Sequence, residues 1–110
     1  DLGADGGHLS PCASPAHCAS ATWQVADSSV ALDQLSEVIK TTPRTEIVTQ
    51  RDNYLHATYS SRIFGFVDDL ELAANDDVTL EARSISRLGE SDLGVNAQRL
   101  ENLSKSINIQ

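Results

Sequence analysis

Hydrophobic residues recur with two different periods along this chain, and the change of period separates the predicted elements. After Asp27 the period is helical, and the apolar residues fall on one stripe made of Val30, Leu35, Val38 and Ile39, with Leu32 at its margin. Ser28 or Ser29 can cap the first turn of this helix. Thr42-Pro43 ends it, because the residue before a proline avoids the helical region.

The next four segments alternate between apolar and polar residues, which is the period of half-buried strands. They cover residues 44–50, 54–60, 67–74 and 78–86. Their apolar faces hold Leu55, Ala57 and Tyr59, then Leu70 and Leu72, then Leu80 and Ala82. Their opposite faces hold polar residues such as His56, Asp69 and Glu71. Consecutive strands with one apolar face predict an antiparallel meander.

The last predicted element is a helix over residues 95–107. Its buried side would hold Asn96, Leu100, Leu103 and Ile107, and its water side Arg99, Glu101 and Lys105. Two helices and a one-faced sheet satisfy each other when both helices cover the apolar face. Residues 23–110 are therefore predicted to form a single α+β domain of order α-β-β-β-β-α, with a four-stranded antiparallel meander sheet and two helices packed on one face.

Residues 1–22 lack a hydrophobic period and predict an irregular N-terminal arm that contains Cys12 and Cys18. A disulfide between these cysteines would stabilise the fold by roughly 2–3 kcal/mol and implies an oxidising compartment. Free thiols are one alternative. The other is a metal clip of Cys12, His17 and Cys18 with His8, but zinc knuckles usually space their cysteines more closely. We favour the disulfide, and expect no metal and no other cofactor.

The amino-acid composition limits the classes of molecule that the chain is expected to bind. The 110 residues carry a formal net charge of −8, which argues against nucleic acid or an anionic membrane as a general partner, and no basic run supplies a local exception. No apolar stretch approaches the roughly 20 residues of a membrane-spanning helix. The chain has no Met and no signal-like start, so we expect a processed or trimmed product.

Candidate binding chemistry gathers in RSISRLGESDLGVN, residues 83–96. Arg83 and Arg87 share the parity of a strand and, with the amides of the following turn, could hold a phosphate or carboxylate. In the structural alternative, which we favour, Asp68 or Asp69 pairs with an arginine and ties the turn down; Arg62 is a further possible partner of Asp68. The candidate ligand-binding residues are Arg83, Arg87, Ser84, Ser86, Asp68, Asp69 and His56.

The sequence contains little that indicates catalysis. His56 is interpreted as a solvated histidine on an open polar sheet face, and no cysteine or serine is placed as its nucleophile. The chain contains no phosphate-binding loop, dinucleotide fingerprint, H-E-x-x-H or EF-hand pattern. We therefore assign no catalytic residue. The apolar segment with Ile63, Phe64 and Phe66 is expected to pack in the core, or alternatively to contact lipid or a partner protein as an exposed edge.

Three motifs link the chain to a known family: CASPAHC at 12–18, FGFVDD at 64–69 and RSISRLGESDLGVNAQR at 83–99. With them the chain resembles, over nearly its whole length, the bacterial and plastid family catalogued as domain of unknown function 1499. The resemblance implies an exported or membrane-tethered setting and supplies no activity.

The leading functional hypothesis is a non-enzymatic, extracytoplasmic binding domain of the cell envelope. Its working surface would be the polar sheet face with the Arg83/Arg87 turn, and its partner a small anion, a lipid-like ligand or an envelope protein. The second hypothesis is a carrier of a small apolar or lipid-like ligand between sheet and helices, which a pocket larger than roughly 300 Å³ between the layers would favour. Hydrolase or isomerase chemistry around His56 and Asp69 is the least favoured.

Overall fold

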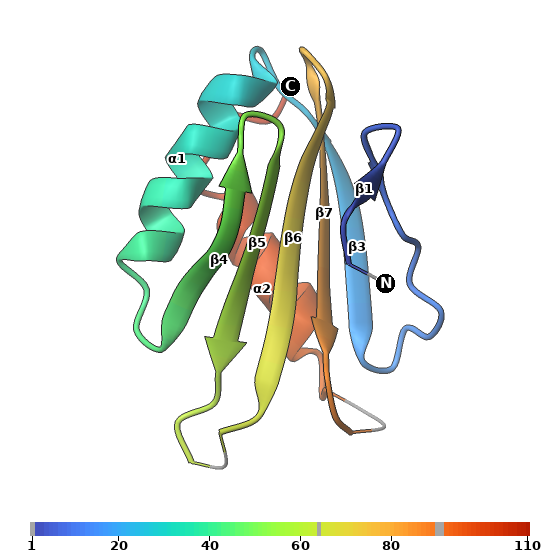
Figure 1. Cartoon of the computed structure of the whole chain (residues 1–110), viewed down its shortest axis with the longest axis vertical. Helices are drawn as coiled ribbons and strands as arrows, with labels where there is room; N and C mark the ends of the chain where they lie inside the picture. The colour runs from blue at the N-terminus through green and yellow to red at the C-terminus, as the bar shows by residue number, and fades with distance from the viewer. Residues whose placement is uncertain (1, 64, 90–91) are drawn as a thin grey trace.

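The computed structural model describes residues 2–63, 65–89 and 92–110. Its centre is an antiparallel sheet of five strands in the order β3-β7-β6-β5-β4, covered on one face by two helices (Figure 1). The strands are β3 Cys18–Gln24, β4 Thr45–Arg51, β5 Tyr54–Ser60, β6 Val67–Asp76 and β7 Thr79–Ser86. The helices are α1 Ser28–Lys40 and α2 Val95–Ser104. The predicted α+β class, the meander of β4 to β7 and the two helices are confirmed.

The predicted strand count is wrong, because β3 adds a fifth strand beside β7. β3 pairs antiparallel with β7 from Cys18 opposite Ile85 to Gln24 opposite Thr79. Its inward positions are Ala19, Ala21 and Trp23. Two of these side chains are alanines, so the sequence shows only a weak alternation between apolar and polar residues. The main-sheet element order is therefore β-α-β-β-β-β-α rather than α-β-β-β-β-α.

The N-terminal arm is irregular only in part, because it contains two short strands before β3 begins at Cys18. β1 Ala4–Asp5 and β2 His8–Leu9 form a small hairpin through Gly6 and Gly7, whose positive φ angles of 60° and 82° suit a tight turn of glycines. The hairpin lies against β6 and β7 on the sheet face away from the helices. The predicted disulfide between Cys12 and Cys18 is present, with the two Cα atoms 5.6 Å apart, so the free-thiol and metal-clip alternatives are excluded.

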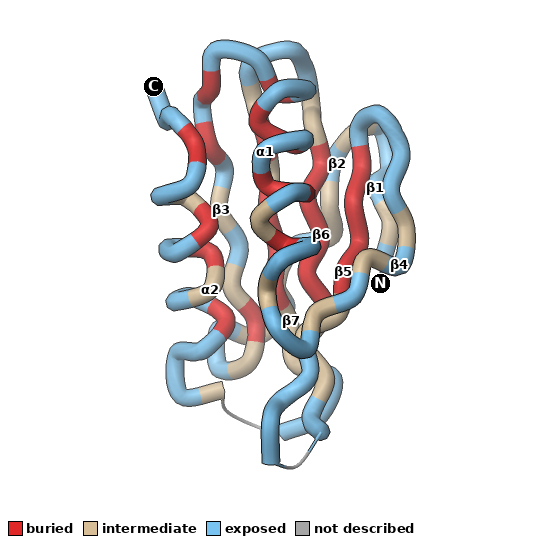
Figure 2. The backbone as a smooth tube through the Cα atoms, turned by 90° about the vertical axis from the view of Figure 1, so that its left-hand side faces the viewer, coloured by how far each residue is buried: buried red, intermediate tan, exposed pale blue. Residues whose placement is uncertain are grey.

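A single hydrophobic core lies between the sheet and both helices, as the buried stretches in Figure 2 show. Burying a leucine side chain contributes roughly 1.5–3 kcal/mol, so its eight leucines dominate the packing. The predicted core residues share it: Leu35, Leu55, Leu70, Leu72, Leu80, Leu100 and Leu103, with Val38 packed against them. Among the described residues, no helix has the length and apolar character required to cross a membrane.

Helix α1 differs from the prediction in two details. Asp27, not Ser28 or Ser29, is the N-cap, and its carboxylate accepts a hydrogen bond from the Val30 amide at 3.2 Å. Val30 itself is exposed, whereas Leu32 is buried. Five residues separate Val30 from the buried Leu35, which turns the two side chains about 140° apart on a helix.

Candidate functional site

The sheet divides the predicted site residues between its two faces. In the register of β6 and β7, Glu71 lies opposite Arg83 and Leu72 lies opposite Ala82. Odd-numbered positions of these strands therefore face the arm and even-numbered positions face the helices. The arm side holds Arg83, Asp69 and His56 together with the Arg87 side chain that contacts Asp69, and the helix side holds Asp68, Ser84 and Ser86.

On the arm side, Glu71 is the centre of a buried network. Arg83 Nη1 donates to its Oε1 at 2.9 Å, and the Tyr54 hydroxyl donates to its Oε2 at 2.6 Å. The amide of Gly3, in the arm, donates to Oε2 at 2.6 Å as well. Burial raises the pKa of the Tyr54 hydroxyl, and its hydrogen bond to Glu71 adds to the rise, so Tyr54 remains a donor. This network holds the arm on the sheet.

Asp69 forms the second arm-side cluster. Arg87 grips both of its oxygens, from Nε to Oδ2 at 2.9 Å and from Nη2 to Oδ1 at 3.0 Å, and His56 Nε2 donates to Oδ1 at 2.7 Å. Burial works to raise the pKa of Asp69, but the hydrogen bonds from Arg87 and His56 outweigh it and leave the pKa below its usual value. The structure thus contains the expected tie between a β6 aspartate and an arginine of the turn.

The prediction of a solvated His56 is wrong, since its ring is buried and paired with Asp69. The polar face is not an open surface, because the arm folds back over β6 and β7. The Leu9 amide donates to Glu81 Oε1 at 2.8 Å, and the Asn75 side-chain amide donates to the carbonyl of Gly7. The arm side is therefore closed by its own hydrogen bonds.

On the helix side, Arg99 of α2 is the central cation. Its Nη1 donates to Asp68 Oδ2 at 2.8 Å, to Ser84 Oγ at 3.1 Å and to Asn96 Oδ1 at 2.9 Å. The Tyr59 ring centre lies 4.3 Å from its guanidinium carbon, which is cation–π geometry. Burial raises the pKa of the Tyr59 hydroxyl, although Arg99 acts in the opposite direction.

Two sequence predictions about this cluster are wrong. The partner of Asp68 is Arg99, not Arg62, Arg83 or Arg87. Arg99 was expected to point to water, yet its side chain is only 14% exposed. Position 99 lies three residues after the buried Asn96 and four before the buried Leu103, so it belongs to the face that α2 turns toward the sheet.

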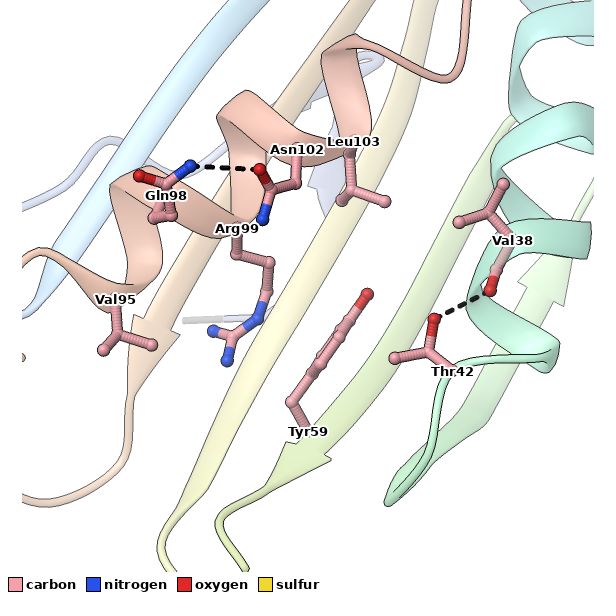
Figure 3. Close-up of a pocket in the computed structure, with 8 residues that line it drawn as sticks. All are labelled: Val38, Thr42, Tyr59, Val95, Gln98, Arg99, Asn102 and Leu103. Atoms are coloured by element: carbon pink, nitrogen blue, oxygen red, sulfur yellow. Dashed lines mark hydrogen bonds between the residues drawn. The ribbon is translucent and has the colours of Figure 1, made fainter.

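Beside this cluster, α1 and α2 leave open space that we call the interhelix cleft, defined as two adjoining hollows that share Thr42, Tyr59, Val95 and Arg99. The first hollow measures about 410 Å³ and lies between the helices. Val38 and Thr42 line it from the α1 side, and Val95, Gln98, Asn102 and Leu103 from the α2 side, with Tyr59 and Arg99 between them (Figure 3).

The second hollow measures about 570 Å³ and continues the cleft toward the loops that follow β5 and β7. Arg44 lines it from the α1 side and Leu93 from the α2 side. Among the described residues these are the non-glycine residues with positive φ, at 57° and 54°. The left-handed conformation costs a non-glycine residue roughly 1–2 kcal/mol, and such strain gathers at ligand clamps and other functional sites.

Sequence reasoning missed Tyr59, Arg99 and Arg44 as site residues. For Arg99 a signal was present, because residues 96, 99, 100 and 103 repeat at i, i+3, i+4 and i+7 and so share one helix face. For Tyr59 the alternation of β5 already placed the ring on the helix side. Arg44 had no signal, since its strained conformation depends on how α1 meets β4.

The family described as "Protein of unknown function (DUF1499)" matches residues 8–107. The match begins at β2, the second strand of the arm hairpin, and extends past α2, so it includes the whole interhelix cleft and the arm side except for Gly3 and β1. No curated protein matches the chain.

Proposed function

Since the chain belongs to the DUF1499 family, whose description names no activity, we propose from its own geometry that it is a binding domain that holds a small amphiphilic, lipid-like ligand in the interhelix cleft. The two hollows measure about 410 and 570 Å³. Pockets for small molecules occupy roughly 300–1,000 Å³ and combine apolar walls with a few polar groups. The cleft has this size and this composition.

The observation that carries the proposal is the position of Arg99 among apolar walls. Val38, Val95 and Leu103 supply surface for a hydrocarbon chain or ring. The hydrogen bonds that Arg99 makes with described residues all leave from Nη1, so Nε and Nη2 are left for an acceptor of the ligand. A ligand with an apolar body and an anionic or carbonyl end fits both features.

The arm side offers fewer free groups to a ligand than the interhelix cleft. Its carboxylates Glu71 and Asp69 are already paired with Arg83 and Arg87, and a ligand would have to displace the arm to reach Glu71. We therefore assign the predicted binding role to the helix-side members of the candidate set. Asp68 and Ser86 line the second hollow, and Ser84 holds Arg99 in place.

We place this binding outside the cytoplasm. The disulfide between Cys12 and Cys18 supports this, because disulfides persist in oxidising compartments and are rare where thiols are kept reduced. The proposed partner is thus an amphiphile of the cell envelope.

The test fills the first hollow without disturbing the core. Asn102 lines that hollow from an exposed position on α2, and Lys105, the exposed C-cap of the same helix, lines neither hollow. The probe is 11-dansylaminoundecanoic acid, an anionic amphiphile that fluoresces more strongly in apolar surroundings. Wild type should bind it saturably, Asn102→Trp about tenfold more weakly, a loss of about 1.4 kcal/mol, and Lys105→Trp like wild type.

Both tryptophan variants should melt within a few degrees of wild type, which separates a filled hollow from a damaged fold. Absence of saturable binding to wild type, or equal binding by both variants, would contradict the proposal.

A further inference from the structure

The end of the molecule at which the cleft opens carries its most exposed apolar side chains. Leu93, Ile63 and Leu88 are 93%, 80% and 73% exposed, the highest values among the large apolar residues that the structure describes. Ile63 lies in the loop between β5 and β6, and Leu88 and Leu93 lie in the loop between β7 and α2. Exposed apolar groups gathered in this way mark contact sites for a partner or a membrane.

These two loops are neighbours at one end of the sheet, at the bottom of Figure 1. Asp68 lies opposite Ser86 in the register, and the Arg87 amide donates to the carbonyl of Val67 at 3.0 Å. Leu88 and Leu93 also line the second hollow, so the apolar tips border the mouth of the cleft.

Three arginines surround the same end, although no basic run is visible in the sequence. The Ser60 amide donates to the carbonyl of Arg44 at 2.9 Å, which places Arg44 beside the end of β5. Arg62 follows two residues after Ser60, and Arg87 directly follows β7. All three arginines are exposed, although Arg87 is also tied to Asp69.

The loop end also carries acidic residues. Asp68 and Asp69 are paired with arginines, Asp92 accepts hydrogen bonds from Asn96 and the Gly94 amide, and Glu46 is exposed near the start of β4.

The other acidic residues that the structure describes lie elsewhere. The turns at the opposite end of the sheet expose Asp27, Asp52, Asp76 and Asp77, with Arg51 beside them. The molecule is 37 Å long, whereas charges in physiological salt are screened over about 8 Å. The arginine-bearing end can therefore meet an anionic surface although the formal net charge is −8.

We propose that this loop end docks on an anionic lipid bilayer, with Ile63, Leu88 and Leu93 entering the headgroup layer and Arg44, Arg62 and Arg87 facing lipid phosphates. Apolar tips flanked by basic residues are the combination that binds membrane interfaces. The inference rests on the proposed function, because docking in this orientation turns the mouth of the cleft toward the membrane. An amphiphile could then pass between bilayer and cleft without crossing water.

The test is flotation with two kinds of unilamellar vesicle, phosphatidylcholine alone and phosphatidylcholine with phosphatidylglycerol. Wild type should float with the anionic vesicles and much less with the neutral ones. Ile63→Glu should lower binding at least tenfold, a loss of about 1.4 kcal/mol. Val48→Glu is the matched control, because Val48 is 55% exposed on β4 and this substitution changes the charge by the same amount as Ile63→Glu. Arg62→Gln should weaken binding to the anionic vesicles, whereas Lys105→Gln should not.

The dansyl amphiphile, used without vesicles, keeps the two proposals apart. Ile63 lines neither hollow, so Ile63→Glu should bind the probe like wild type, and Asn102→Trp should still float. Wild type that ignores anionic vesicles while binding the probe would overturn docking and leave the cleft function standing. Equal losses for Ile63→Glu and Val48→Glu would also overturn docking. A wild-type dimer that Ile63→Glu converts to monomer, with no flotation, would mark the apolar end as a protein interface instead.

Discussion

Strand β6 carries acid–arginine pairs on both faces of the sheet, and the pairs of Glu71 and Asp68 differ in what covers them. On the arm side Glu71 meets Arg83 at 2.9 Å, and the two side chains are 1% and 5% exposed. On the helix side Asp68 meets Arg99 at 2.8 Å, and both side chains are 14% exposed. The arm seals the first pair, whereas the interhelix cleft borders the second. The same chemistry therefore holds the fold together on one face and remains within reach of a ligand on the other.

The largest effect is expected on the sealed side. Glu71→Gln keeps the shape of the side chain but leaves the Arg83 charge buried without its carboxylate. Breaking a buried pair in this way costs about 3–5 kcal/mol, and urea unfolding at pH 7 measures it. Glu37→Gln is the control, because the Glu37–Lys40 pair is exposed and pairs of that kind contribute about 0–1 kcal/mol. A loss below about 1 kcal/mol for Glu71→Gln would show that the arm does not seal this face.

The two faces were not equally predictable from sequence. Leu70 and Leu72 alternate with Asp69 and Glu71, and this period predicted the direction of these four side chains correctly. The cover on the polar face could not be predicted, because it depends on the backbone amides of Gly3 and Leu9 reaching carboxylates about seventy positions away. Backbone donors leave no trace in a hydrophobic pattern, so an alternating strand was interpreted as half exposed.

The disulfide is the second way to test the seal. Replacing Cys12 and Cys18 by serine frees the segment that leads from the arm hairpin into β3. The loss of a short covalent loop should lower the free energy of unfolding by about 2–3 kcal/mol. Hydrogen exchange at the Leu9 amide should accelerate more than exchange in β5. Reduction of the wild type is the control and should reproduce both effects; if neither effect occurs, the hairpin is held by its hydrogen bonds alone.

The Asp69 cluster predicts a specific dependence on pH. Because Arg87 and His56 keep the pKa of Asp69 below its usual value, its ionised form contributes stability that is fully present above the unfolded-state pKa of about 3.9. That contribution is lost as the pH falls through the lower pKa of the folded state. Asp69→Asn should cost about 1–2 kcal/mol at pH 7, less than Glu71→Gln, since Arg87 is half exposed and can be solvated.

Unfolding midpoints between pH 7 and pH 2 measure this effect. The gap between wild type and Asp69→Asn should narrow below about pH 4. Asp33→Asn, an exposed change of the same type on α1, should follow the wild type at every pH. A constant gap across the range would remove the carboxylate of Asp69 as its source.

On the helix side, the sequence predicted several residues that line the cleft but did not predict the cleft. Val38, Leu103 and Tyr59 were each placed on inward faces, and Asp68 was expected to need an arginine. The hydrophobic periods do not predict the distance between α1 and α2. This separation leaves the space that Tyr59 and Arg99 border. That separation depends on side-chain volumes summed over both helices and the sheet, and no local pattern reports it.

The smallest expected effect completes the comparison of the two β6 pairs. Asp68→Asn is the same acid-to-amide change as Glu71→Gln, beside an arginine at nearly the same distance. Arg99 keeps the oxygens of Ser84 and Asn96 and the Tyr59 ring, and water in the cleft can solvate it, so the change should cost only about 1 kcal/mol. Loss of the negative charge should also make an anionic probe bind more tightly, because Arg99 is then the unopposed charge at the cleft floor. Urea unfolding of both amide variants side by side, with titration of the dansyl amphiphile into Asp68→Asn, measures the two quantities. A cost equal to that of Glu71→Gln would mean that the Asp68–Arg99 pair is sealed as well, and the cleft would then lack the cation on which its proposed ligand depends.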